Sequence, residues 1–226
     1  LVDLAMAKVQ NETGTIAENQ AAMQLGTGKS KEYDTLGLGD GICNAIEMAI
    51  ECNKYDQLPD AKGKVKPRFA EKNAQRIWAV RANLVNIGQT CAQNGNEAGV
   101  LKYWGAFTDS AEEPLFAAMD KAPEKEYAGQ VAFFAGRYAF QAKDMARANK
   151  YFEIAKRDPT QKEEALNFQL FAMRQQLTSR EDSLGFINKL KQIYEQEPEN
   201  DVVIDGINSM YEGLKDKAAQ AAFLDA

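Results

Sequence analysis

Histidine is absent from this chain of 226 residues. Proteins use histidine more often than any other side chain as a general base near neutral pH and as a neutral metal ligand. Acidic pairs such as Glu112 and Glu113 do not replace it, because adjacent residues on a helix do not face each other. We therefore expect no enzymatic activity, no metal site and no cofactor; an enzyme with an unfamiliar site is the disfavoured alternative.

Cysteine is scarce as well. The three residues, Cys43, Cys52 and Cys91, form no C-x-x-C pair, and their odd number leaves at least one thiol without a partner in the chain. Cys43 and Cys52 fall in one helical segment, which separates them by about 13 Å along its axis. That separation is too large for a disulfide within an intact helix. All three cysteines are expected to be small core residues.

Long apolar runs and an excess of positive charge are missing too. The longest apolar stretches, such as Val131–Ala135, are far shorter than the roughly 20 residues that cross a bilayer. The formal net charge is −6, from 27 basic and 33 acidic residues, which argues against a nucleic-acid surface. The basic run Lys62–Arg68 is interpreted as a solvated loop between helices, and a phosphate contact is its less favoured interpretation. We expect neither membrane insertion nor nucleic-acid binding.

The glycine cluster Gly37–Gly41 is the segment that comes closest to a phosphate-binding loop. It lacks the G-x-G-x-x-G spacing, and no Lys-Ser or Lys-Thr pair follows it. We therefore interpret this cluster as a turn or a helix kink, without a nucleotide.

Helical periodicity is what the sequence has in abundance. Apolar residues recur at steps of three and four, as in Leu170, Met173 and Leu177, and each such set makes one apolar stripe on a helix. Alternating strand patterns are scarce. Breakers such as Asn94-Gly95 and Asp158-Pro159 separate the helical segments. The predicted fold class is all-α, with roughly ten helices of about 12 to 24 residues.

Small and bulky residues also recur at matched positions. The pattern resembles the tetratricopeptide repeat, in which W-x2-L-G-x2-Y on one helix precedes A-x3-F-x2-A on the next, with a period of about 34 residues. Positions 174 and 208 are 34 residues apart, 136 and 174 are 38 apart, and 88 and 136 are 48 apart. Arg174 and Asn208 replace the usual glycine or alanine, so their repeats are degenerate. The matching residues are Leu84, Ile87, Gly88, Cys91, Val100, Trp104 and Phe107; Ala132, Ala135, Gly136, Ala139, Ala148, Phe152 and Ala155; Leu170, Met173, Leu177, Phe186, Leu190 and Ile193; and Ile204, Ile207 and Tyr211.

This resemblance implies a right-handed α-α superhelix built from antiparallel helix pairs. Residues 1–69 are expected to form a loose repeat-like pair with the basic loop, and residues 70–226 to hold the repeats. The repeats are placed at about 71–108, 125–159 and 161–198, with an insert at 109–121 and a partial repeat at 199–226. Within the insert, residues 112–119 are predicted to form an extra short helix.

A more specific likeness concerns three segments, Asp60–Arg68, Asn83–Asn86 and Ala111–Ala117. They resemble envelope-exported tetratricopeptide proteins of Bacteroidetes-type bacteria, which are mostly of unassigned function. The resemblance implies a periplasmic or envelope location after removal of a signal, with the cytoplasm as the alternative. A start without methionine is interpreted as processing. Ala218–Ala226 lacks a polar terminal cap, so we expect further repeats or another copy to cover this end.

The resemblance also implies a binding surface, because the first helix of each pair lines a concave groove in this family. Aromatic side chains beside arginine and glutamine suit the anchoring of a peptide. The predicted function is therefore non-catalytic binding of a protein or peptide segment. Two alternatives stay open: self-packing or the 109–121 insert fills the groove, or the chain is a structural spacer that self-associates through its C-terminal end. The groove residues are Val85, Gln89 and Gln93; Phe133, Arg137, Phe140 and Gln141; and Phe168, Phe171 and Gln175.

Overall fold

The computed structural model describes residues 1–26 and 30–225, and the described residues form helices without a β-strand. This confirms the all-α prediction. Residues 27–29 of the predicted N-terminal pair and Ala226 of the partial repeat lie outside the described residues. The elements are α1 (Val2–Leu25), α2 (Thr35–Asp56), α3 (Ala70–Arg81), α4 (Asn83–Gln93), α5 (Glu97–Glu112), the 3-10 turns η1 (Pro114–Phe116) and η2 (Ala122–Glu124), α6 (Ala128–Gln141), α7 (Met145–Ala155), α8 (Lys162–Arg174), α9 (Arg180–Gln196), α10 (Asp201–Gly213) and α11 (Lys217–Leu224).

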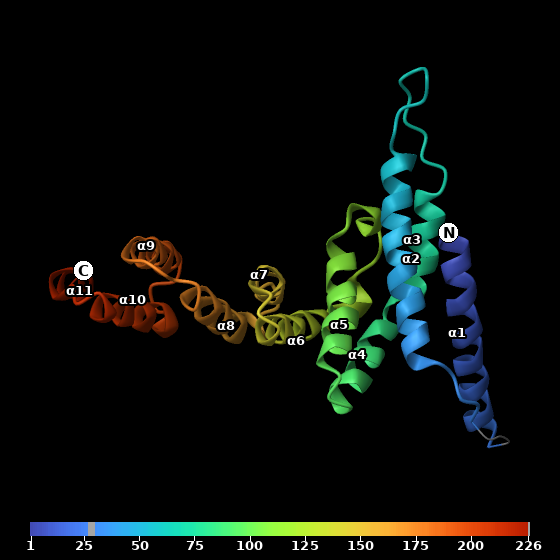
Figure 1. Ribbon diagram of the computed structural model, residues 1–226, viewed down its shortest axis with the longest axis horizontal. Helices are drawn as coiled ribbons and strands as arrows, with labels where there is room; N and C mark the ends of the chain where they lie inside the picture. Colours follow the sequence, from blue (N-terminus) through green and yellow to red (C-terminus); the bar gives the residue numbers. More distant parts are fainter. Residues whose placement is uncertain (27–29, 226) are drawn as a thin grey trace.

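The helices pack mainly against their neighbours in the chain, so the molecule extends from one end to the other (Figure 1). Helices α1, α2, α3 and α5 stand side by side near the N-terminus. From there α6, α8 and α10 follow one another in a row, with α7 and α9 beside them, and the C-terminus lies at the far end (Figure 1). Among the described residues, no helix is both long and apolar enough to cross a membrane.

One turn geometry recurs between paired helices. Gly95, Lys143 and Lys215 all have φ between 56° and 68°, in the left-handed region that a helix C-terminus often uses. The next residue in each turn is Asn or Asp, whose side chain caps the following helix. The backbone N–H of that capping residue donates to a carbonyl in the last turn of the preceding helix: Asn96 to Cys91 (2.8 Å), Asp144 to Ala139 (2.9 Å) and Asp216 to Tyr211 (3.0 Å).

Close approach within two pairs depends on glycine. Gly88 on α4 faces the Trp104 ring of α5, and Gly136 on α6 faces the Phe152 ring of α7. A Cβ atom at position 136 would lie 2.7 Å from Cε1 of Phe152. At the matching position of α8, Arg174 is exposed, and α8 approaches α9 less closely than α6 approaches α7.

The structure of the insert at 109–121 differs from the sequence prediction. Helix α5 continues through Glu112, and the extra short helix predicted at 112–119 is only the single 3-10 turn η1, which η2 follows at the end of the insert. Pro114 explains the stop: it disfavours helical geometry at Glu113, whose ψ is 136°. Phe116 is fully buried, with its ring 5.7 Å from that of Trp78 on α3. The turn η1 packs against α2, α3 and α5.

Three further sequence predictions can be compared with the structure in the N-terminal half. The glycine cluster Gly37–Gly41, predicted as a turn or a helix kink, lies within the first turns of α2, so it is not a turn. It lets the helix pack closely, since a Cβ at Gly41 would come 3.0 Å from Val9 of α1. The cysteines are free and at least half-buried, as predicted for core residues. The predicted unit 71–108 holds three helices, α3, α4 and α5, instead of one pair.

Candidate functional site

Four of the expected groove residues on α6 and α8 meet with Phe134 in what we call the aromatic strip, formed by Phe134, Arg137, Phe140, Phe168 and Phe171. The rings of Phe140 and Phe171 lie 5.6 Å apart across the two helices. The Arg137 guanidinium lies 5.3 Å from the Phe168 ring centre and 5.9 Å from that of Phe134. Such distances suit cation–π attraction, which holds the arginine against the aromatic surface.

Phe133 is a correction to the predicted groove wall. Its side chain is 2% exposed and packs against Phe152 and Phe168, with ring centres 6.0 Å and 5.5 Å away. Neighbouring helix residues point about 100° apart, so Phe133 turns into the α6–α7 seam while Phe134 turns to Trp104. The sequence analysis therefore missed Phe134. The sequence signal for Phe134 was the pair of consecutive phenylalanines at 133 and 134. Helical periodicity alone does not show which of the two faces the core.

The remaining predicted residues are more accessible. Phe171 is 49% exposed, whereas Phe140 and Phe168 are half-buried. The glutamines at 89, 93, 141 and 175 are exposed. Val85 is half-buried, and its backbone carbonyl accepts the indole N–H of Trp104 at 3.0 Å. Self-packing thus covers most of the strip and leaves the Phe171 ring as its open part.

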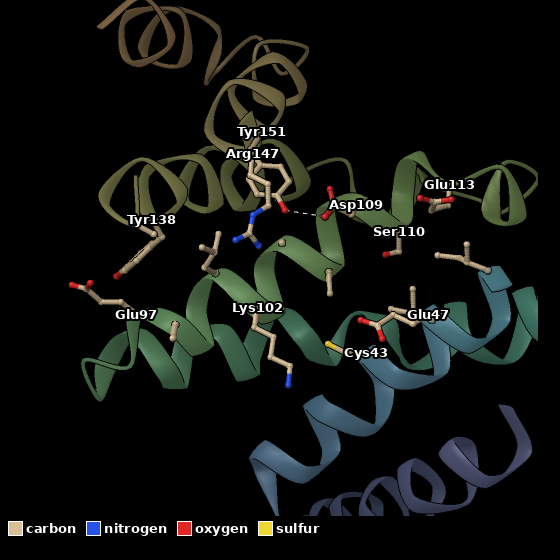
Figure 2. Close-up of a pocket in the computed structure, with 17 residues that line it drawn as sticks. Cys43, Glu47, Glu97, Lys102, Asp109, Ser110, Glu113, Tyr138, Arg147 and Tyr151 are labelled. Carbon is tan, nitrogen blue, oxygen red and sulfur yellow. Dashed lines mark hydrogen bonds between the residues drawn. The ribbon is translucent and has the colours of Figure 1, made fainter. Parts of the chain in front are cut away.

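A separate hollow of about 650 Å³, which we call the α5 cleft, runs along α5 between α2 on one side and α6 and α7 on the other (Figure 2). None of the predicted groove residues lines it. Its walls come mainly from α2, α5 and α7, the second helices of their pairs, whereas the sequence analysis looked only at first helices. The lining residues are Cys43, Ile46, Glu47, Ile50, Glu97, Ala98, Leu101, Lys102, Gly105, Ala106, Asp109, Ser110, Glu113, Tyr138, Ala142, Arg147 and Tyr151.

The centre of the cleft is held by Asp109. Its carboxylate accepts the Tyr151 hydroxyl at 2.9 Å and pairs with Lys150 at 2.7 Å. Burial raises the pKa of Tyr151, and the nearby Asp109 charge raises it further, so the phenol stays protonated as a donor. Gly105 leaves room for this contact, because a Cβ there would lie 2.8 Å from the Tyr151 hydroxyl oxygen.

The two cations lining the cleft already have partners. Lys102 pairs with Asp40 at 2.8 Å, and Arg147 pairs with Asp144 at 2.6 Å. Burial favours the protonated form of Asp40, but hydrogen bonds from Lys102 and Tyr103 outweigh it and lower the pKa of that carboxyl. Both cations are therefore neutralised by the protein itself.

Three carboxylates at the rim lack such partners. Within the described part of the chain, no basic side chain lies within ion-pair distance of Glu47, Glu97 or Glu113. Figure 2 places Glu97 near one end of the cleft and Glu113 near the other, with Glu47 on the α2 side. Between them apolar side chains such as Ala98 and Ala106 lie beside the polar centre formed by Asp109 and Tyr151. The cleft thus combines apolar patches and a polar centre with three carboxylates at its rim.

The cleft is lined by one thiol, that of Cys43. Burial raises the pKa of the Cys43 thiol to about 12, so the thiolate is negligible near neutral pH. In the described ranges, no cluster of three or more Cys, Asp or Glu side chains is arranged to hold a metal ion.

Comparisons with known proteins add no further identification. No protein-family model matches this chain, and neither a curated protein nor a solved structure is similar to it at a significant level.

Proposed function

We propose that this chain is a non-catalytic protein-binding module whose helix pairs form a tetratricopeptide-like right-handed superhelix. The recurring left-handed turns at Gly95, Lys143 and Lys215 support the repeat, since each precedes an equivalent capping residue. So does the glycine-against-aromatic contact shared by the α4–α5 and α6–α7 pairs. A periplasmic or envelope location is part of the proposal and rests on the sequence resemblance alone.

The observation that carries the binding role is the open ring of Phe171. An aromatic side chain that is 49% exposed loses favourable burial unless a partner covers it. Phe140 lies against it, and Arg137 sits in the same strip. This combination suits a partner segment that places an apolar side chain on the Phe140–Phe171 pair and an acidic group near Arg137.

Phage-displayed random peptides selected on the purified chain test this role. We expect selected peptides to carry an apolar residue near an acidic one, and Phe171→Ala to weaken their binding by about tenfold or more. Leu184→Ala is the matched control, because Leu184 is also exposed, at 40%, but lies on α9. Binding that survives Phe171→Ala unchanged contradicts the proposal. A large fall in melting temperature would instead assign Phe171 to the core.

A structural spacer role is the second candidate, favoured by a separate hollow between α9, α10 and α11. Lys191, Tyr194, Tyr211 and Phe223 line it, and the Tyr194 and Phe223 rings are 5.2 Å apart. A further helix pair or a second copy would fit there. Sedimentation at two concentrations distinguishes the candidates: a rise in mass that Phe223→Asp abolishes supports the spacer, and a constant monomer mass excludes self-association.

A further inference from the structure

We infer that the α5 cleft is a second binding site, which accepts an amphipathic helix of a partner protein with Lys or Arg at both ends of its apolar stripe. The site shares no residue with the aromatic strip, so this inference does not depend on the proposed role of Phe171. It rests on three properties of the cleft: its length, its floor and its charge.

The length of the cleft suits a short helix. Glu97 and Glu113 bound it near the two ends of α5, and sixteen residues of α-helix span about 24 Å. A partner helix lying along α5 would therefore use about four turns. The walls are helices whose backbone groups bond internally, so no sheet edge is offered to an extended strand.

The floor is shaped for side chains of moderate size. The small side chains of Ala98, Ala106 and Ala142 leave space in the cleft. Ile46 and Ile50 of α2 form an apolar wall beside them. A volume of about 650 Å³ admits a row of side chains from one helix face while the rest of the helix stays outside. An apolar stripe with i, i+3, i+4 and i+7 spacing meets this floor.

The carboxylates at the rim of the cleft favour a partner that carries positive charge. Glu47, Glu97 and Glu113 are free of ion pairs among the described residues, whereas Lys102 and Arg147 are neutralised by Asp40 and Asp144. Together with Asp109, the lining carries four carboxylates against two cations, a net charge of −2, which favours a partner with Lys or Arg over a phosphate or an acidic peptide. With Glu97 and Glu113 near opposite ends, the complementary charges belong at both ends of the partner stripe.

The test uses fluorescein-labelled synthetic peptides and the complete chain. The probe has about 16 residues, a Leu and Ala stripe at helical spacing, and Lys near both ends. Two control peptides keep the length: one carries Glu in place of Lys, and one has the Lys-containing sequence scrambled so that the stripe is lost. We expect a Kd on the order of 10 μM for the probe, because the interface is small. Both controls should bind at least tenfold more weakly.

Charge reversal in the protein locates the site. Glu97→Lys with Glu113→Lys should weaken the probe at least tenfold, whereas Glu126→Lys with Glu212→Lys makes the same change in net charge at exposed positions outside the cleft and should leave it unchanged. Circular dichroism checks that both variants fold. Absence of binding, equal binding of the scrambled peptide, or equal loss in both double variants would overturn the inference. So would loss of probe binding in Phe171→Ala, which would place the peptide on the aromatic strip.

Discussion

At the scale of single residues, the most unusual group is Arg81, whose side chain is completely buried. Its guanidinium is sandwiched between the rings of Trp78 and Phe107, 4.0 Å and 4.1 Å from their centres. It donates to both carboxylate oxygens of Glu124 at 2.7 Å and to Ser110 at 2.7 Å. Burial lowers the pKa of Arg81, although the Glu124 charge opposes that change. This one side chain ties α3, α5 and η2 together.

Arg81→Met should therefore cost about 3–5 kcal/mol of unfolding free energy, because it leaves the Glu124 carboxylate buried without its partner. Urea denaturation measures the loss. The double variant Arg81→Met with Glu124→Leu removes both charges and should recover a substantial part of it. A double variant that loses as much as the two single variants together would show that the two groups do not interact.

Little in the sequence marked this residue. Arg81 ends α3 directly after Trp78, Ala79 and Val80, and Glu124 follows 43 residues later, beyond the predicted insert. Periodicity treats an arginine near the end of a helix as solvated, since its usual neighbours are solvent and the helix dipole. Only the packing of η2 beside α3 and α5 brings the two charges together.

At the scale of elements, helix approach decides where glycine is needed. Gly136 lies inside α6, where alanine would be favoured by about 1 kcal/mol on helix propensity alone. The Phe152 ring of α7 fills the space that a methyl group would need, and that ring is fully buried. Gly185 also lies inside a helix, α9, but nothing lies within 4 Å of its missing Cβ.

These two glycines make a matched pair. Gly136→Ala should lower the unfolding free energy by about 1–2 kcal/mol, because overpacking outweighs the gain in helix propensity. Gly185→Ala should raise it by about 0.5–1 kcal/mol, because only the gain in propensity remains. Chemical denaturation of both variants provides the comparison. Stabilisation by Gly136→Ala would mean that α6 and α7 are not held as closely as the structure shows.

The recurring pairs were largely predictable from the sequence because the signals for a helix pair are local. Asn94-Gly95 marked a turn, and the matched positions at 88 and 136 identified the glycines that contact an aromatic ring. The insert was less predictable. Proline at 114 stops α5, but the partner of Phe116 is Trp78, far back in the chain.

At the scale of the whole molecule, the apolar core divides into two clusters. One extends from α1 to the start of α8, and both tryptophans belong to it or pack against it. The other joins α8, α9 and α10 through fewer buried side chains, with α11 residues packed at its edge. In a row of helices each pair contacts mainly its neighbours, so stability need not be uniform along the row.

Urea should therefore unfold the C-terminal cluster first. Far-UV circular dichroism reports every helix, whereas tryptophan fluorescence reports only the N-terminal cluster that holds Trp78 and Trp104. We expect the dichroism signal to begin its fall at lower urea than the fluorescence signal. Leu190→Ala, in the second cluster, should move only the early dichroism phase. Superimposable transitions in the unsubstituted chain would show one cooperative unit instead.

The sequence by itself determined the helices and many of the turns that join them. Apolar spacing, capping residues and turn residues act within a few positions of one another, so their physical effect can be read without the fold. Only the tertiary structure decided which of two consecutive phenylalanines faces the core, that Arg81 pairs with Glu124, and that a cleft lies along α5. Each depends on how helices far apart in the chain approach, and that approach follows from the summed packing of many side chains.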